Sequence, residues 1–183
     1  MQLHTDIFPE NEFAAMMSVN VRQSLERKRK AGLFVGAFAP YGYHKDPDDR
    51  NHLIIDLDAA WVVMDIFFWY VDGMMTKAGI ARKLNSRCIP SPTAYKQDCG
   101  EKYVNPRAQG LWTATAVSRI LNNPLYVGVL QQGKQRVISH RVHTRLSVPQ
   151  TEWCIVEDAV PPILNRDYFD AAQALHKRAA TTI

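Results

Sequence analysis

Residues 59–71, AAWVVMDIFFWYV, form the longest apolar run of the chain, interrupted only by Asp65. The run is too short to span a bilayer, so it predicts a buried helix. Its side chains are apolar nearly all round, which indicates the core helix of a domain. Asp58 or Asp56 can cap its start, and Gly73 is expected to end it.

Two short helices are predicted after this core helix. Thr76 can cap the first, over residues 77–86, and a proline-rich stretch stops it. Residues 93–111 are polar and predict a long loop. Thr113 can then cap a third helix, over residues 114–122. One bracing helix followed by two short ones is the order of a helix-turn-helix DNA reader.

The third short helix has an outer surface suited to DNA. Val117, Ile120 and Leu121 share its inner face, and Arg119 can make a bidentate contact to guanine. The outer or N-terminal surface is left with Thr113, Thr115, Ala116, Ser118, Arg119 and Asn122. The long connection over residues 87–112 departs from a standard helix-turn-helix, so the pattern alone leaves open an unassigned domain with three core helices.

The remaining segments predict strands and one closing helix. Short strands are expected at 53–57, 126–130, 136–140 and 153–156, and the last three are expected to form one small antiparallel sheet. Asn165 or Asp167 opens the closing helix. The predicted fold class is mainly α with a small antiparallel β-sheet (α+β). Its core is helix-turn-helix-like, with a long insertion before the third helix.

The N-terminal part predicts an amphipathic helix that lacks a local partner. Over residues 10–31, apolar side chains recur from Phe13 to Leu25, the run Arg27–Lys30 crowds the end, and Gly32 follows. We expect its apolar stripe to contact another chain or another domain. Residues 32–43, with their glycines, proline and aromatic side chains, predict an extended connector.

Charge distribution points to a polyanionic partner. The net charge is +4, and no Asp or Glu occurs between Glu101 and Glu152. The cations of that stretch are Lys102, Arg107, Arg119, Lys134, Arg136, Arg141 and Arg145, with His140 and His143 beside them. Such a one-sign surface suits DNA, because each neutralised phosphate releases counterions. A solvated basic face without a partner is the alternative.

Several classes of function are disfavoured by the sequence. The N-terminus shows no secretory signal, so a cytoplasmic protein is expected. Cys88, Cys99 and Cys154 form no CxxC pair, and we expect no metal, no cofactor, no small-molecule substrate and no membrane partner. A small hydrolase using Cys154 or Cys99 with a histidine lacks any nucleophile motif.

The connector motif Gly32-x-Phe34-x-Gly36-x-x-x-Pro40-Tyr41-Gly42-Tyr43 resembles the linker of large serine recombinases. Further matches follow in the family's order, and the resemblance covers roughly residues 10–178. They are Ile55-Asp56, Gly73, Ile80-Ala81-x-x-Leu84-Asn85, Trp112-Thr113, Val117-x-x-Ile120-Leu121-x-Asn123-Pro124-x-Tyr126-x-Gly128, and Val160-Pro161-Pro162-Ile163 with Phe169.

The resemblance implies three parts and a role in DNA binding. Residues 1–31 would be the C-terminal part of the long helix that follows a catalytic domain, with self-association through residues 10–31. Residues 32–43 would be an extended minor-groove linker, and residues 44–183 the recombinase DNA-binding domain. The expected DNA-binding residues are Arg27, Lys28, Arg29, Lys30, Gly32, Phe34, Gly36, Tyr41, Thr113, Thr115, Ala116, Ser118, Arg119, Lys134, Arg136 and Arg141.

The implied function is sequence-specific binding of duplex DNA, at one half of an attachment site, within a serine site-specific recombinase that integrates or excises DNA. No serine of this chain matches the family's catalytic position, so strand cleavage is not expected of this polypeptide. The alternative is a stand-alone transcriptional regulator of the helix-turn-helix type.

Overall fold

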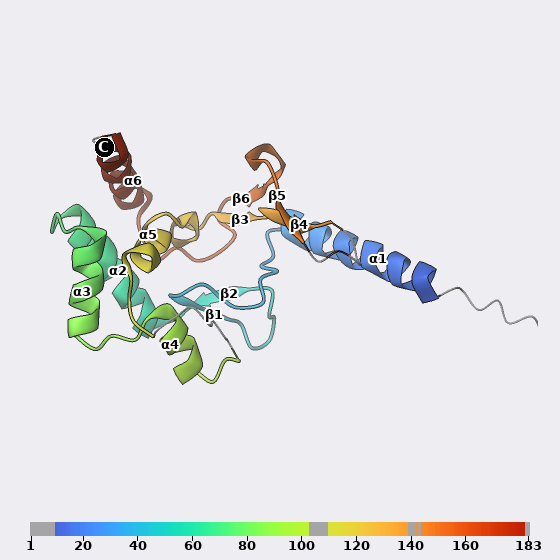
Figure 1. The fold of residues 1–183 in the computed structure, drawn as a ribbon, viewed down its shortest axis with the longest axis horizontal. Helices are drawn as coiled ribbons and strands as arrows, with labels where there is room; N and C mark the ends of the chain where they lie inside the picture. The colour runs from blue at the N-terminus through green and yellow to red at the C-terminus, as the bar shows by residue number, and fades with distance from the viewer. Residues whose placement is uncertain (1–9, 103–109, 139–141, 143, 182–183) are drawn as a thin grey trace, which may run out of the picture.

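The computed structural model describes residues 10–102, 110–138, 142 and 144–181 (Figure 1). The helices are α1 (Glu10–Lys30), α2 (Leu57–Val71), α3 (Lys77–Ser86), α4 (Pro92–Asp98), α5 (Ala114–Leu121) and α6 (Arg166–Thr181). The strands are β1 (Tyr43–Lys45), β2 (Leu53–Ile55), β3 (Leu130–Gln132), β4 (Gln135–Val137), β5 (Arg145–Ser147) and β6 (Cys154–Val156). This arrangement confirms the predicted α+β class.

The strands form three separate antiparallel pairs instead of one small sheet. β1 pairs with β2, β3 with β6, and β4 with β5. The predicted strand at residues 126–130 was largely wrong. A 3-10 turn occupies Pro124–Val127, because Asn123 caps it and Pro124 opens it, and β3 begins only at Leu130. The ring of Tyr126 lies in the core, where it stacks on Tyr43 at 6.1 Å between centroids.

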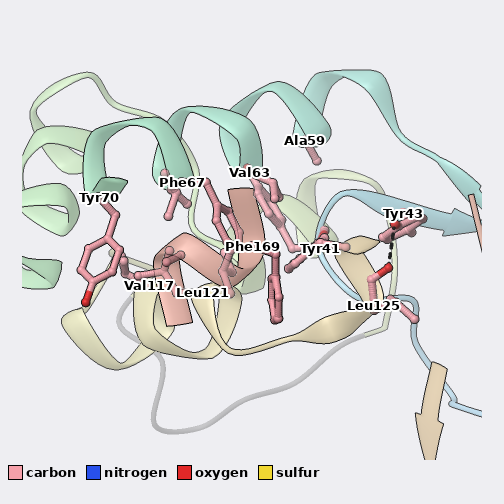
Figure 2. Close-up of a cluster of buried hydrophobic side chains, with 14 of the residues drawn as sticks. Tyr41, Tyr43, Ala59, Val63, Phe67, Tyr70, Val117, Leu121, Leu125 and Phe169 are labelled. Carbon is pink, nitrogen blue, oxygen red and sulfur yellow. Dashed lines mark hydrogen bonds between the residues drawn. The ribbon is translucent and has the colours of Figure 1, made fainter. Parts of the chain in front are cut away.

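Helix α2 is the centre of the core, as predicted (Figure 2). Asp56 is its N-cap, and Val63, Ile66 and Phe67 have no exposed surface. The helix is apolar nearly all round, but it is not buried on every side. Trp61 is 67% exposed and Phe68 is 54% exposed, because the helices that cover α2 leave one of its faces open.

Helices α3 and α5 contact each other and α2, which gives the predicted three-helix core. Thr76 and Thr113 cap α3 and α5, each accepting a hydrogen bond at 3.1 Å from the backbone N–H three residues on. The side chain of Asn85 bonds both the N–H (2.8 Å) and the carbonyl (3.0 Å) of Trp112. The two short helices therefore meet although residues 87–112 separate them in sequence.

The insertion between α3 and α5 contains a helix, α4, where the sequence predicted only a loop. Ser91 caps α4 and Pro92 opens it, a combination that favours a helix start. Tyr95 ties the helix to the core, because its hydroxyl donates to Asp56 Oδ2 at 2.8 Å. The Ser91-Pro92 pair could therefore have indicated the start of α4, but the prediction used it only as the end of the preceding helix.

Helices α6 and α1 lie at the two sides of this core (Figure 1). Helix α6 covers α2, with Phe169 and Ala172 buried and the Phe169 ring 6.0 Å from that of Phe67. Helix α1 extends away from the core, and within the described part of the chain its C-terminal half contacts β6 and the turn at Asn51. Among the described residues, no helix is both long enough and apolar enough to cross a membrane.

Candidate nucleic-acid interface

Helix α5 presents a narrow polar face on the outside of the three-helix core. Thr113, Thr115 and Arg119 are exposed, and Ser118 is half-buried. The inner face, Val117, Ile120 and Leu121, is buried against the core, which fixes the direction of the outer one. This is the helix surface that the sequence predicted for base contacts.

Three of the residues predicted on this outer face already have contacts within the protein, which leaves fewer of them free to contact a ligand. The Thr113 hydroxyl already accepts the N–H of Ala116, and Ala116 is half-buried against the core. The Asn122 side chain donates to the Ser118 carbonyl at 2.8 Å and to its hydroxyl at 3.3 Å. Arg119 and Thr115 therefore remain as the exposed side chains of this face for which the described residues show no such local role.

Helix α3 adds a basic surface that sequence reasoning left out. No Asp or Glu lies between Asp72 and Asp98, and the run carries Lys77, Arg82, Lys83, Arg87 and Lys96. The ammonium of Lys83 lies 4.0 Å from the centre of the Trp69 ring, and the guanidinium of Arg87 lies 5.1 Å from it. Cation–π contacts of this kind orient both charges. The sequence feature that could have revealed this surface is residues 73–97, a second stretch without Asp or Glu.

The connector that follows α1 is hydrogen-bonded to two separate residues of the domain, Asn51 and Gln132. The Asn51 backbone carbonyl accepts the N–H of Phe34 (2.8 Å), and its amide donates to the Phe34 carbonyl (2.9 Å). Gln132 donates to the Leu33 carbonyl (2.8 Å) and accepts the N–H of Val35 (2.9 Å). These four hydrogen bonds, here called the connector clamp, fix residues 33–35 to two distant parts of the chain.

The predicted roles of Phe34 and Tyr41 conflict with their placement. Phe34 is 8% exposed, and Tyr41 is 7% exposed and packs edge-on against Tyr95 and Trp112. Both aromatic side chains fill the core, because the connector closes over the domain instead of standing apart from it. Neither ring is open to a DNA groove in this conformation.

The connector glycines serve contacts within the protein. Gly32 has φ +73° and follows α1, and an added Cβ there would lie 3.2 Å from Val156 Cγ1. At Gly36 an added Cβ would lie 2.3 Å from the Phe34 ring. Gly32 and Gly36 were among the expected DNA-binding residues; the close approaches visible here are to Val156 and Phe34.

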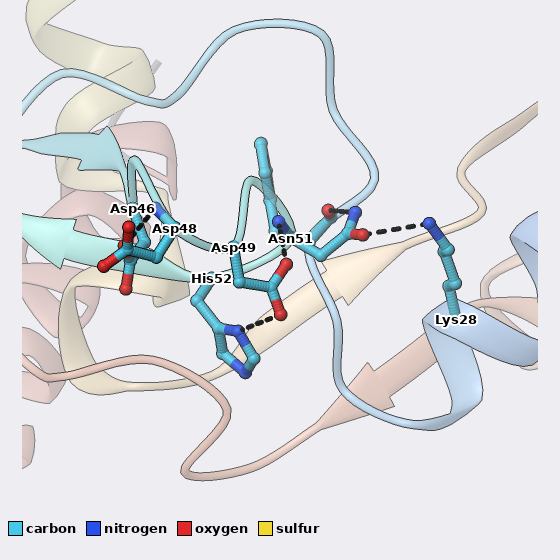
Figure 3. A network of polar contacts seen from close by, with 7 residues as sticks. Lys28, Asp46, Asp48, Asp49, Asn51 and His52 are labelled. Atoms are coloured by element: carbon cyan, nitrogen blue, oxygen red, sulfur yellow. Dashed lines mark hydrogen bonds and ion pairs between the residues drawn. The ribbon is translucent and has the colours of Figure 1, made fainter.

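The basic end of α1 is partly engaged by the domain. Lys28 Nζ donates to Asn51 Oδ1 at 2.9 Å (Figure 3), and Lys30 pairs with Glu26 at 2.9 Å. The turn that carries Asn51 is shaped by Asp49, which accepts the Asn51 N–H at 2.9 Å. That hydrogen bond, with a smaller contribution from His52, lowers the pKa of Asp49. Arg27 is exposed, and Arg29 is half-buried.

The cations of residues 102–151, the long stretch without Asp or Glu, lie on several different elements of the fold. Arg119 lies on α5, Arg136 on β4 and Arg145 on β5, all exposed. Lys134 Nζ lies 4.8 Å from the centre of the Trp153 ring. Arg107, Arg141, His140 and His143 lie outside the described residues. Arg136 faces a cleft whose opposite wall is α1.

Two solved structures have a similar fold. One is a crystal structure of a LSR–DNA complex, with a TM-score of 0.54 and 15% sequence identity over 88% of this chain and 38% of that one. The other concerns the sequence requirements of the Listeria innocua prophage attP site, with a TM-score of 0.52 and 15% identity over 87% of this chain and 52% of that one. This chain thus corresponds to about half or less of each of those two chains.

The Recombinase family model matches residues 57–179, from the start of α2 into α6. The match covers more than half of the chain and includes all three helices of the core. It confirms the family to which the sequence motifs pointed, and the chain belongs to the Recombinase family.

Proposed function

We propose that this chain binds duplex DNA as the DNA-binding part of a serine site-specific recombinase and recognises one half of an attachment site. The observation that supports this most directly is the α3–α5 pair. The two helices pack against each other and against α2, they lie within the segment that matches the Recombinase family, and α5 carries Arg119 and Thr115 on its outer face. Two short helices braced by a third are the arrangement expected of a helix-turn-helix reader. One of the similar structures is a DNA complex.

Within this proposal, α5 enters the major groove and the basic side chains around it contact phosphates. Arg119 reads a base edge, while Lys83 and Arg87, oriented by Trp69, neutralise the backbone. The proposed division keeps residues 1–31 as the helix that joins a catalytic domain, residues 32–43 as the linker and residues 44–183 as the DNA-binding domain. Self-association through residues 10–31 is part of the same proposal, because Phe13 and Val21 are more than half exposed.

The test is a selection of bound duplexes from a random library, followed by affinity measurements across a salt series. We expect enrichment of one sequence and an affinity that falls steeply as salt rises, because counterions are released from each neutralised phosphate. The double variant Lys83→Ala, Arg87→Ala should bind all duplexes more weakly without changing the enriched sequence. A flat salt response of the unmodified chain would contradict DNA binding altogether, and no enrichment would contradict half-site recognition.

A further inference from the structure

A cleft of about 760 Å³ lies between the C-terminal half of α1 and the strands β4 and β6. Arg22, Arg29 and Lys30 line it from α1, and Arg136 lines it from β4. The four cations thus come from two segments that are distant in sequence, and the fold brings them to one place.

Two carboxylates also line the cleft, and they do not balance its charge. Glu26 is held by Lys30, with 2.9 Å between Nζ and Oε1. Glu152, from the short turn before β6, is exposed. After the Glu26–Lys30 pair is set aside, three arginines face one exposed carboxylate, so the cleft favours an anion.

Arg29 is the cation of the cleft whose surroundings point most directly to an anionic ligand. Its Nε is buried, and within the described part of the chain it donates no hydrogen bond. A buried donor without an acceptor is unfavourable, and a guanidinium presents its donors in a fixed plane that matches phosphate oxygens. An oxyanion in the cleft would accept from the guanidinium of Arg29, whose Nε has no acceptor among the described residues.

The wall that carries Arg29 is fixed in place. The N–H of Gly32 donates to the Arg29 carbonyl and that of Leu33 to the Lys28 carbonyl, each at 3.0 Å, which closes the helix end. Gly32 in turn lies against Val156 of β6. The two walls are therefore set before any ligand arrives, which lowers the entropic cost of binding.

We propose that this cleft holds the phosphodiester backbone of duplex DNA, with Arg29 and Arg136 donating to phosphate oxygens from opposite walls. The inference rests on the proposed DNA binding and names a contact site for it. Arg22 and Arg29 lie about 10 Å apart along the axis of α1, given the rise of a helix. A row of that length suits a strand of successive phosphates better than a single small anion.

The experiment measures the affinity of the full chain for a short duplex of arbitrary sequence across a salt series. The variants are Arg29→Met, Arg136→Gln and the double variant. Arg166→Gln is the control, because Arg166 is an exposed arginine that lies outside the cleft, 3.6 Å from Glu157. Circular dichroism and thermal unfolding verify that each variant is folded, and Arg136→Gln changes an exposed position where folding is least affected.

We expect each cleft variant to reduce the steepness of the salt dependence by about 1, the share of one phosphate contact, and the control to leave it unchanged. If both arginines hold one phosphate, the double variant loses less than the sum of the single losses. A normal salt dependence of the unmodified chain together with control-like cleft variants would overturn the cleft assignment alone. No binding by the unmodified chain would instead overturn the proposed function.

A second measurement separates DNA from a free anion. The NMR signal of the Arg29 Nε–H group should shift when the duplex is added and stay in place when inorganic phosphate is added at the same phosphate concentration. An equal shift with inorganic phosphate, combined with an unchanged salt dependence in Arg29→Met, would show a small-anion site instead of a DNA contact.

Discussion

Arg119 is the residue on which sequence readout by this chain is expected to depend most. It is exposed in the last turn of α5, while its neighbours Val117 and Ile120 anchor the helix in the core. Replacing Arg119 by Ala should relax the sequence preference and cost about 1–3 kcal/mol on the enriched half-site. Competition binding against duplexes with single base changes measures both effects.

Arg119→Lys is the matched control for that prediction. Lysine keeps the charge and loses the two parallel donors, so it should retain most affinity for arbitrary duplexes while losing discrimination. An unchanged preference in Arg119→Ala would remove this residue from the readout and leave Thr115 as the side chain to test.

Prediction from the sequence worked best where a residue type has a well-defined local role, such as capping or ending a helix. Thr76 and Thr113 were predicted as helix caps, Asp58 or Asp56 as the cap of α2, and Gly32 as the residue that follows a helix end. The structure places Thr76, Thr113, Asp56 and Gly32 in these positions. Prediction was least decisive where an aromatic side chain fits two roles. Phe34 and Tyr41 were assigned to DNA, but an aromatic ring beside a glycine fits a tight core contact equally well, and only the tertiary fold separates these cases.

At the scale of elements, the three core helices could be predicted and the strand pairs could not. Helices depend on neighbouring residues, so periodicity and caps reveal them. The pairing of β3 with β6 joins residues more than 20 positions apart, and nothing local specifies it. The cleft between α1 and β4 was equally out of reach, because its arginines meet only through that pairing and the helix end at Gly32.

The connector clamp gives a prediction about how α1 is held. The double variant Asn51→Ala, Gln132→Ala removes three side-chain hydrogen bonds to the backbone of residues 33–35. Each substitution should lower the free energy of unfolding by about 1–3 kcal/mol, since it leaves partly buried polar groups without partners. It should also broaden the angle between α1 and the domain.

Pulsed electron resonance between spin labels measures that angle. Labels at Ser24 on α1 and Asp170 on α6, both exposed, in a chain with its three cysteines replaced, should give one narrow distance distribution before the change and a wide one after it. Gln131→Ala, on the same strand as Gln132, is the control. A narrow distribution in the double variant would show that other contacts hold the helix.

For the molecule as a whole, the tyrosines predict its behaviour in alkali. Burial raises the pKa of Tyr41, Tyr43 and Tyr126 well above the ordinary value of 10.0, and burial together with Asp56 does the same for Tyr95. The folded chain therefore keeps protons that the unfolded chain releases near pH 10. Stability is unaffected below that pH and falls as the pH rises above it.

Spectroscopic titration tests this prediction. Phenolate absorbance from these four tyrosines should appear together with the loss of the circular dichroism signal, in one cooperative step. Tyr126→Phe should reduce the amplitude of that step, because it removes the most deeply buried phenol. Phenolate formation that is complete before any loss of helix signal would contradict the burial of these rings.

The fixed connector also gives α1 the mechanical properties of a lever. A helix of 21 residues is about 30 Å long, and among the described residues its contacts with the domain gather toward one end, near Gly32 and Val156. A tilt of about 10° at that end moves the far end by about 5 Å, close to one helical turn. A small rearrangement around Asn51 and Gln132 is thus magnified at Phe13 and Met17, where a partner would detect it as a change in position.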